Sequence, residues 1–114
     1  MREILFRGKS VDNNEWVYGY LIKGATRYVI QTSIAQYPQY DVIPETIGQY
    51  SGLKNKYNQK IFEGDILREY SNDIEDWVVS YEYGKFVGTF DNVCEDLYEI
   101  SDLEVIGNIY DKEV

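Results

Sequence analysis

The stretch of sequence that decides the fold class is Trp77-Val78-Val79-Ser80-Tyr81-Glu82-Tyr83. From Trp77 onward, a large apolar side chain occupies every second position. A period of two carried by aromatic and β-branched residues is typical of a strand, whereas a helix repeats about every 3.6 residues. The same period recurs in residues 15–22, where one face collects Trp16, Tyr18, Tyr20 and Ile22.

Short alternating runs fill much of the remaining sequence, at residues 3–7, 26–31, 60–70 and 103–110. Helical signals are weak: residues 44–46 predict one short turn, and residues 91–101 have the apolar spacing for another. We therefore expect a mainly β fold, a small barrel-like or multi-sheet domain of about six or seven short strands with one or two short helical turns. The length of 114 residues predicts a single domain over residues 1–114.

Composition excludes several kinds of chemistry. The chain has no His, so Ser-His or Cys-His catalysis and His-ligated metals are excluded. Cys94 is the one cysteine, which excludes an intrachain disulfide, and we expect it to be a small buried residue. We predict no catalytic residue, no cofactor and no enzymatic activity. No apolar run is long enough for a signal peptide or a membrane helix, so we expect a cytoplasmic protein without a membrane partner.

Charge is unevenly distributed along the chain. Twenty acidic and eleven basic residues give a net charge of −9. Residues 61–114 hold three basic and fifteen acidic residues, a net charge of −12, whereas residues 1–60 carry +3. An acidic protein repels phosphate backbones, so we expect no direct nucleic-acid binding. The acidic half is either a solvated face, a surface complementary to a basic partner or to the basic half of another copy, or a mimic of nucleic-acid charge.

Two groups of side chains are candidates for a site. Neighbouring carboxylates can bind a hard cation or act as an acid–base pair, but they can equally be exposed charge; they are Glu63, Asp65, Asp73, Glu75 and Asp76. The second candidate is an exposed aromatic loop in the least regular stretch, containing Tyr37 and Tyr40. Tyrosines suit protein interfaces, and they also pack in cores, so both interpretations stay open.

Three separated motifs occur in order along the chain: residues 46–56, Thr-Ile-Gly-Gln-Tyr-Ser-Gly-Leu-Lys-Asn-Lys; residues 61–67, Ile-Phe-Glu-Gly-Asp-Ile-Leu; and residues 104–110, Glu-Val-Ile-Gly-Asn-Ile-Tyr. Together with residues 1–8 and 16–19, they make the chain resemble the YopX family of phage and prophage proteins from end to end. One departure is Tyr57-Asn58-Gln59, where relatives commonly have an Asn-Gly turn.

The resemblance implies a mainly β, barrel-like protein and supplies no catalytic residue. The polar members of the motifs are either hydrogen-bonding partners within tight turns or a surface site; they are Gln49, Tyr50, Glu63, Asp65 and Asn108. We therefore expect a non-enzymatic phage accessory protein that binds a host or phage protein in the host cytoplasm and associates with itself. Two alternatives remain: a metal-dependent enzyme or small-ligand binder that uses the carboxylates named above, and an acidic mimic of nucleic acid.

Overall fold

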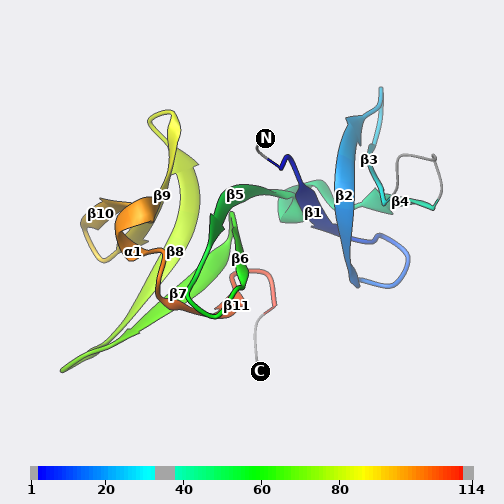
Figure 1. The fold of residues 1–114 in the computed structure, drawn as a ribbon. Coiled ribbons are helices and arrows are strands. Elements are labelled where there is room, and N and C mark those ends of the chain that lie inside the picture. Colours follow the sequence, from blue (N-terminus) through cyan, green and yellow to red (C-terminus); the bar gives the residue numbers. More distant parts are fainter. Residues whose placement is uncertain (1–2, 33–37, 112–114) are drawn as a thin grey trace. The chain divides into compact units, whose positions relative to one another are not determined.

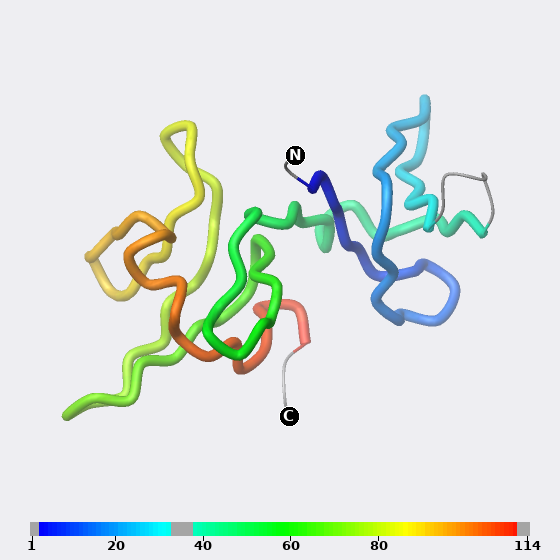
Figure 2. The backbone as a smooth tube through the Cα atoms, viewed as in Figure 1, coloured from blue at the N-terminus to red at the C-terminus, as the bar shows by residue number. Residues whose placement is uncertain are grey.

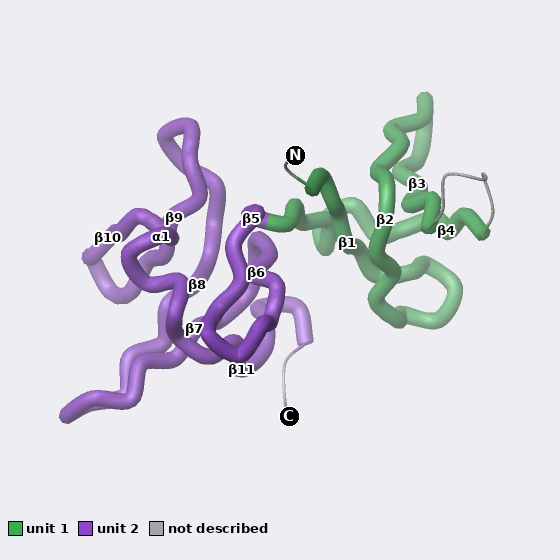
Figure 3. The backbone as a smooth tube through the Cα atoms, viewed as in Figure 1, with its two compact units in different colours: residues 1–50 green, residues 51–114 purple. Residues whose placement is uncertain are grey.

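The computed structural model describes residues 3–32 and 38–111, and the chain forms two compact units, residues 1–50 and 51–114 (Figures 1 and 3). The described residues contain eleven strands, one short α-helix and one 3-10 turn, so the predicted mainly β, multi-sheet fold is confirmed. More strands form than the six or seven expected, partly because residues 60–70 make two strands joined by a turn at Glu63 and Gly64. The single domain over residues 1–114 stays a prediction.

Unit 1 contains four antiparallel strands of a six-stranded sheet, in the order β4-β3-β2-β1. Its strands are β1 (Phe6–Lys9), β2 (Trp16–Lys23), β3 (Tyr28–Gln31) and β4 (Gln39–Val42), and Figure 2 follows the chain through them. The 3-10 turn η1 (Pro44–Thr46) lies where Pro predicted it and leads into β5 (Gly48–Lys54), whose first residues pair with β1.

The end of β4 lies beside the end of β1. Ser10 and Val42 form an isolated antiparallel bridge, and the N–H of Ile43 donates to the carbonyl of Lys9 at 2.9 Å. Gly8 allows this approach, because a β-carbon there would lie 3.1 Å from that of Val42. The sheet thus wraps around the buried Ile30 and Val42, although in the described residues the wrapping stops short of a closed barrel.

Unit 2 contains the larger core. After the end of β5 come β6 (Lys60–Phe62), β7 (Asp65–Tyr70), β8 (Ile74–Glu82), β9 (Lys85–Phe90), β10 (Val93–Asp96), α1 (Leu97–Ile100) and β11 (Glu104–Asn108). The last five strands form an antiparallel sheet in the order β10-β9-β8-β7-β11. Its core side chains are buried together; they are Ile61, Leu67, Trp77, Val79 and Leu97. The helix α1 packs closely on β9, because a β-carbon at Gly88 would overlap the side chain of Ile100.

The turn between β5 and β6 is organised by a buried amide. Asn55 is 6% exposed, and its Oδ1 accepts hydrogen bonds from the N–H groups of Tyr57 at 2.9 Å and Gln59 at 3.0 Å. Its Nδ2 donates to Oε1 of Gln59 and to the carbonyl of Leu103. Asn58, at the departure from the family pattern, has φ of 65°, a left-handed conformation that Asn tolerates better than most residues. The turn therefore forms without glycine.

Candidate interaction surface

Strand β2 turns its aromatic face outward from the sheet of unit 1. The inward positions are Val17, Gly19 and Leu21, of which Gly19 is buried and the other two half-buried. The outward positions are Trp16, which is half-buried, and Tyr18, Tyr20 and Ile22, which are 46%, 50% and 43% exposed. Glycine is required at the inward position, because a β-carbon at Gly19 would overlap the carbonyl oxygen of Gln31 in β3.

A pocket of about 400 Å³ lies at this outward face. Its lining comes from three segments of unit 1: Glu3, Ile4, Leu5, Tyr18, Gly19, Tyr20 and Thr32. Ile4 is itself 57% exposed, so apolar surface continues from the tyrosines toward the beginning of the chain. The lining also carries polar groups, which are the carboxylate of Glu3, the hydroxyls of the two tyrosines and the hydroxyl of Thr32; the last donates to the carbonyl of Pro38 at 3.1 Å.

Cations lie over aromatic rings at three places in the described part of unit 1. The guanidinium carbon of Arg7 lies 4.7 Å from the ring centre of Trp16, and Nζ of Lys9 lies 5.4 Å from it. Arg7 pairs with Tyr18 and Lys9 with Trp16, so both cations lie on the face of the sheet that carries Tyr18, where they are largely buried. Nζ of Lys23 lies 6.0 Å from the ring centre of Tyr28. All these distances are within the range of cation–π attraction.

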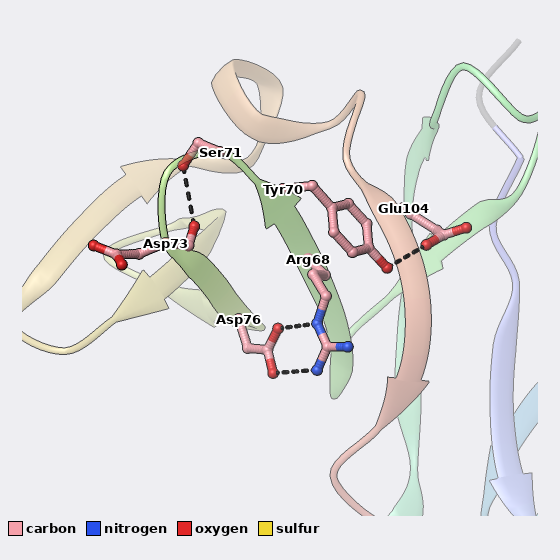
Figure 4. Close-up of polar contacts among 6 residues, drawn as sticks. All are labelled: Arg68, Tyr70, Ser71, Asp73, Asp76 and Glu104. Carbon is pink, nitrogen blue, oxygen red and sulfur yellow. Dashed lines mark hydrogen bonds and ion pairs between the residues drawn. The ribbon is translucent and has the colours of Figure 1, made fainter.

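In unit 2, strand register aligns a row of charges (Figure 4). Arg68 of β7 faces Glu104 of β11 on one side and Asp76 of β8 on the other. Its Nε and Nη2 donate to the two carboxylate oxygens of Asp76 at 2.7 and 2.9 Å. These hydrogen bonds hold the pKa of Asp76 below its ordinary value. The hydroxyl of Tyr70 donates to Glu104 at 2.9 Å, which raises the pKa of Tyr70.

The carboxylates considered for a metal site do not converge on one point in the described part of the chain. Asp76 is paired with Arg68, Glu75 lies opposite Glu69 in the β7–β8 ladder, and the backbone carbonyl of Asp73 accepts from the hydroxyl of Ser71 (Figure 4). In residues 3–32 and 38–111, no group of three or more Asp, Glu, Cys or His side chains is arranged to hold a metal ion.

Two of the motif residues organise turns in unit 2. Asp65 is 2% exposed, and its Oδ2 accepts the N–H of Phe62 at 2.7 Å across the turn from β6 to β7. Within that turn, Gly64 has φ of 89°, and its N–H donates to the carbonyl of Val79. Asn108 lies opposite Asp65 in the β7–β11 ladder, and its Oδ1 accepts the N–H groups of Tyr110 and Asp111, both at 2.9 Å. The structure thus gives Asp65 and Asn108 hydrogen-bonding roles within turns.

The remaining motif residues are at least partly covered. Glu63 is half-buried in the same turn as Asp65. Gln49 is half-buried in β5 opposite Phe6, and Tyr50 is 5% exposed with its N–H donating to the carbonyl of Leu5 at 2.8 Å.

Two expectations from the sequence need correction. Tyr40 is not in a loop: it is half-buried in β4, because its backbone pairs with Ile30 of β3, and Tyr37 lies outside the described residues. Cys94 is exposed rather than buried, because β10 is the terminal strand of its sheet and has β9 on one side alone.

Sequence reasoning missed the two features with the clearest geometry. The outward face of β2 was visible as an alternation, but its exposure depends on how the sheet wraps. Asn55 lies near the end of the motif of residues 46–56, and its buried role depends on its hydrogen bond to the distant carbonyl of Leu103. Neither feature has a local sequence signal of its own.

Comparisons with known proteins agree with the sequence motifs. A family model described as YopX protein matches residues 5–113, which includes all three motifs. No curated protein matches the chain. Among the described residues, no helix combines the length and apolar character needed to cross a membrane.

Proposed function

The chain belongs to the YopX family, and from that premise we propose that it is a phage accessory protein that acts by binding another protein and not by catalysis. The observation that carries the proposal is the outward face of β2, where Tyr18, Tyr20 and Ile22 are 43–50% exposed beside a pocket. Single exposed apolar residues are common on any protein. Contiguous apolar surface around a pocket, rich in tyrosine, is typical of protein interfaces.

The partner is a host or phage protein, and its contact is centred on Tyr20. Tyrosine supplies a large contact area at a small cost in side-chain entropy, because it has two rotatable torsions. Residues near the centre of an interface dominate its binding energy, and aromatic side chains are frequent among them. Loss of the Tyr20 ring is therefore expected to weaken binding more than loss of an exposed tyrosine elsewhere.

Affinity capture from a bacterial host lysate, followed by mass spectrometry, tests this proposal. The bait proteins are the wild type, Tyr20→Ala and the matched control Tyr98→Ala, whose side chain is 75% exposed on α1. A protein retained by the wild type and the control but lost with Tyr20→Ala supports the proposal. Equal retention by all three baits contradicts it, and so does retention of nothing at either low or moderate salt.

Self-association is a second part of the proposal. Counted by compact unit, residues 1–50 hold five basic and five acidic residues, a net charge of zero, whereas residues 51–114 hold six and fifteen, a net charge of −9. Neither unit has a net positive charge, so the basic surface in a contact between copies is a local cluster. This cluster is Lys54, Lys56 and Lys60 around the β5–β6 turn, and it would meet an acidic surface of another copy. Sedimentation equilibrium at tens of micromolar protein is expected to show oligomers that dissociate as salt rises. A monomer at low salt would contradict this part alone.

A further inference from the structure

We propose that the free edge of β10 binds an extended basic segment of another protein as an additional antiparallel strand. β10 is the terminal strand of the sheet in unit 2 and has β9 on one side (Figure 1). All four of its residues, Val93–Asp96, are exposed. A strand at the edge of a sheet can pair with a strand of another chain, because its outward N–H and C=O groups have no neighbouring strand. This edge shares no residue with the tyrosine face of β2, so the proposal goes beyond the proposed function and does not depend on it.

The opposite edge of the same sheet is covered. The N–H of Val105 in β11 donates to Oε1 of Gln59 at 3.3 Å, and the carbonyl of Leu103 accepts from Nδ2 of Asn55 at 3.0 Å. The register of β11 with β7 also shifts between Val105 and Gly107. Covering side chains, bulges, lysine and proline are the usual means by which proteins block a sheet edge. In contrast, β10 pairs in unbroken register with β9, and its sequence contains neither Lys nor Pro.

The turn into β10 determines which of its backbone groups face the free edge. A two-residue turn, Asp91-Asn92, connects β9 to β10, and Asp91 in it has φ of 51°. The residues that flank such a turn form a hydrogen-bonded pair, and hydrogen-bonded and non-hydrogen-bonded pairs then alternate along the two strands. Val93 and Glu95 therefore direct their backbone groups toward β9. Cys94 directs its N–H and C=O toward the free edge, and Asp96 directs its N–H there.

The charge around this edge favours a basic occupant. Residues 86–111 contain no Lys or Arg, and residues 91–104 contain six acidic residues, which are Asp91, Glu95, Asp96, Glu99, Asp102 and Glu104. Lys85 of β9 forms an ion pair with Asp96 on one face of the sheet. Glu95 lies on the other face, together with Val93, and among the described residues it has no ion-pair partner.

A basic strand fits this edge better than a second copy of β10 does. Opposite charges on directly opposed residues of two strands stabilise the pairing, and like charges destabilise it. A Lys or Arg opposite Glu95 would therefore strengthen the pairing, whereas β10 of a second copy would bring its own carboxylates against Glu95 and Asp96. The net charge of −9 in residues 51–114 also attracts a basic segment to this unit.

The test is an NMR titration of the isotope-labelled full chain with three end-blocked heptapeptides. The first is Ser-Lys-Thr-Lys-Thr-Lys-Ser, whose lysines and threonines lie on opposite faces of a strand. When its lysines share the face of Glu95, its threonine N–H groups point at β10. The second peptide has glutamate in place of lysine. The third is the lysine peptide with a methyl group on the backbone nitrogen of both threonines, which keeps the charge and removes those two donors.

We expect the lysine peptide to shift the amide signals of Cys94 and Asp96. The glutamate peptide and the methylated peptide are each expected to bind at least about tenfold more weakly, the first through charge repulsion and the second through lost hydrogen bonds. Glu95→Gln is expected to raise the Kd for the lysine peptide at least about threefold. The matched control is Glu45→Gln, which removes the same charge at an exposed position of η1 and leaves the Kd unchanged.

Four results would overturn the inference. The first is equal binding of the lysine peptide and either of the other two peptides, and the second is a Kd that Glu95→Gln leaves unchanged. The third is the absence of binding at millimolar peptide, or shifts that fall outside β9, β10 and α1. The fourth is a shift of the Cys94 and Asp96 signals with protein concentration when no peptide is present, which would assign the edge to a second copy of this chain.

Discussion

Replacement of Asn55 by alanine is expected to destabilise unit 2 strongly. Asn55 is 6% exposed and makes four side-chain hydrogen bonds, two as acceptor within its turn and two as donor, to Gln59 and to the carbonyl of Leu103. Alanine removes all four. The contact with Leu103 spans 48 positions of sequence, so it ties the β5–β6 turn to the segment that leads into β11.

The size of the destabilisation depends on which hydrogen-bond partners of Asn55 can bind water once the amide is removed. A net hydrogen bond contributes about 1 kcal/mol, and a buried group left unpaired costs about 1–3 kcal/mol. Tyr57 and Gln59 are exposed, so water replaces part of what their N–H groups lose, whereas the half-buried carbonyl of Leu103 is less accessible. We expect a loss of about 2–3 kcal/mol in the free energy of unfolding. For a chain of this length, that loss corresponds to a fall in Tm of about 8–12 °C.

The two tryptophans allow each unit to be followed separately, because Trp16 lies in unit 1 and Trp77 in unit 2. In a Trp16→Phe background, the fluorescence of Trp77 during denaturation reports unit 2. The control is Asn58→Gly in the same turn, at a left-handed and exposed position, where the midpoint is expected to stay equal or to rise slightly. An Asn55→Ala midpoint within about 2 °C of the parent would refute the reasoning that these bonds hold the turn.

Three further outcomes are expected. Gly19→Ala loses at least about 3 kcal/mol in unit 1, because its β-carbon meets the backbone of β3; an unchanged midpoint for Trp16 fluorescence in a Trp77→Phe background would contradict the close approach. Trp16 and Trp77, followed separately, have coincident unfolding midpoints if residues 1–114 fold as one domain, and separate midpoints would show two domains. The pKa of Asp76 is lowered in the folded state, so the stabilisation it adds is present above its unfolded value of 3.8 and is lost as the pH falls below about 4. The difference in Tm between the wild type and Asp76→Asn therefore shrinks from pH 5 to pH 2, and a constant difference would contradict that role.

Much of the fold was predictable because strand formation is encoded locally. Alternating aromatic and β-branched side chains disfavour a helix at residues 77–83, and the structure has a strand there. The turn at Gly64 that divides residues 60–70 into two strands was not predicted, because these residues form one alternating run in the sequence; Gly64 has φ of 89°, a conformation that a residue with a β-carbon adopts at a cost. The interpretation of Asp65 as a hydrogen-bonding partner in that turn, one of the two left open, agrees with its short bond to Phe62.

The candidate site was less predictable, because its parts are far apart in sequence. The pocket lining comes from residues 3–5, 18–20 and 32, and no motif connects these three segments. The stretch around Tyr37 and Tyr40 has no regular alternation, which favoured an exposed loop. Tyr40 is instead held in β4, because its backbone pairs with β3. Backbone pairing between distant residues is invisible to a local pattern.

The sequence by itself therefore determined the class of structure, the positions of most strands and of the turn at residues 44–46, and the family. Only the tertiary structure decided which face of each strand is buried. The two strongest alternations have opposite outcomes: Trp77 and Val79 of β8 point into a core, whereas Tyr18 and Tyr20 of β2 point outward. The reason is physical: a period of two separates two faces, but burial depends on what lies opposite. In β2 the face with Val17, Gly19 and Leu21 is at least half-buried, whereas Tyr18 and Tyr20 on the other face are 46% and 50% exposed.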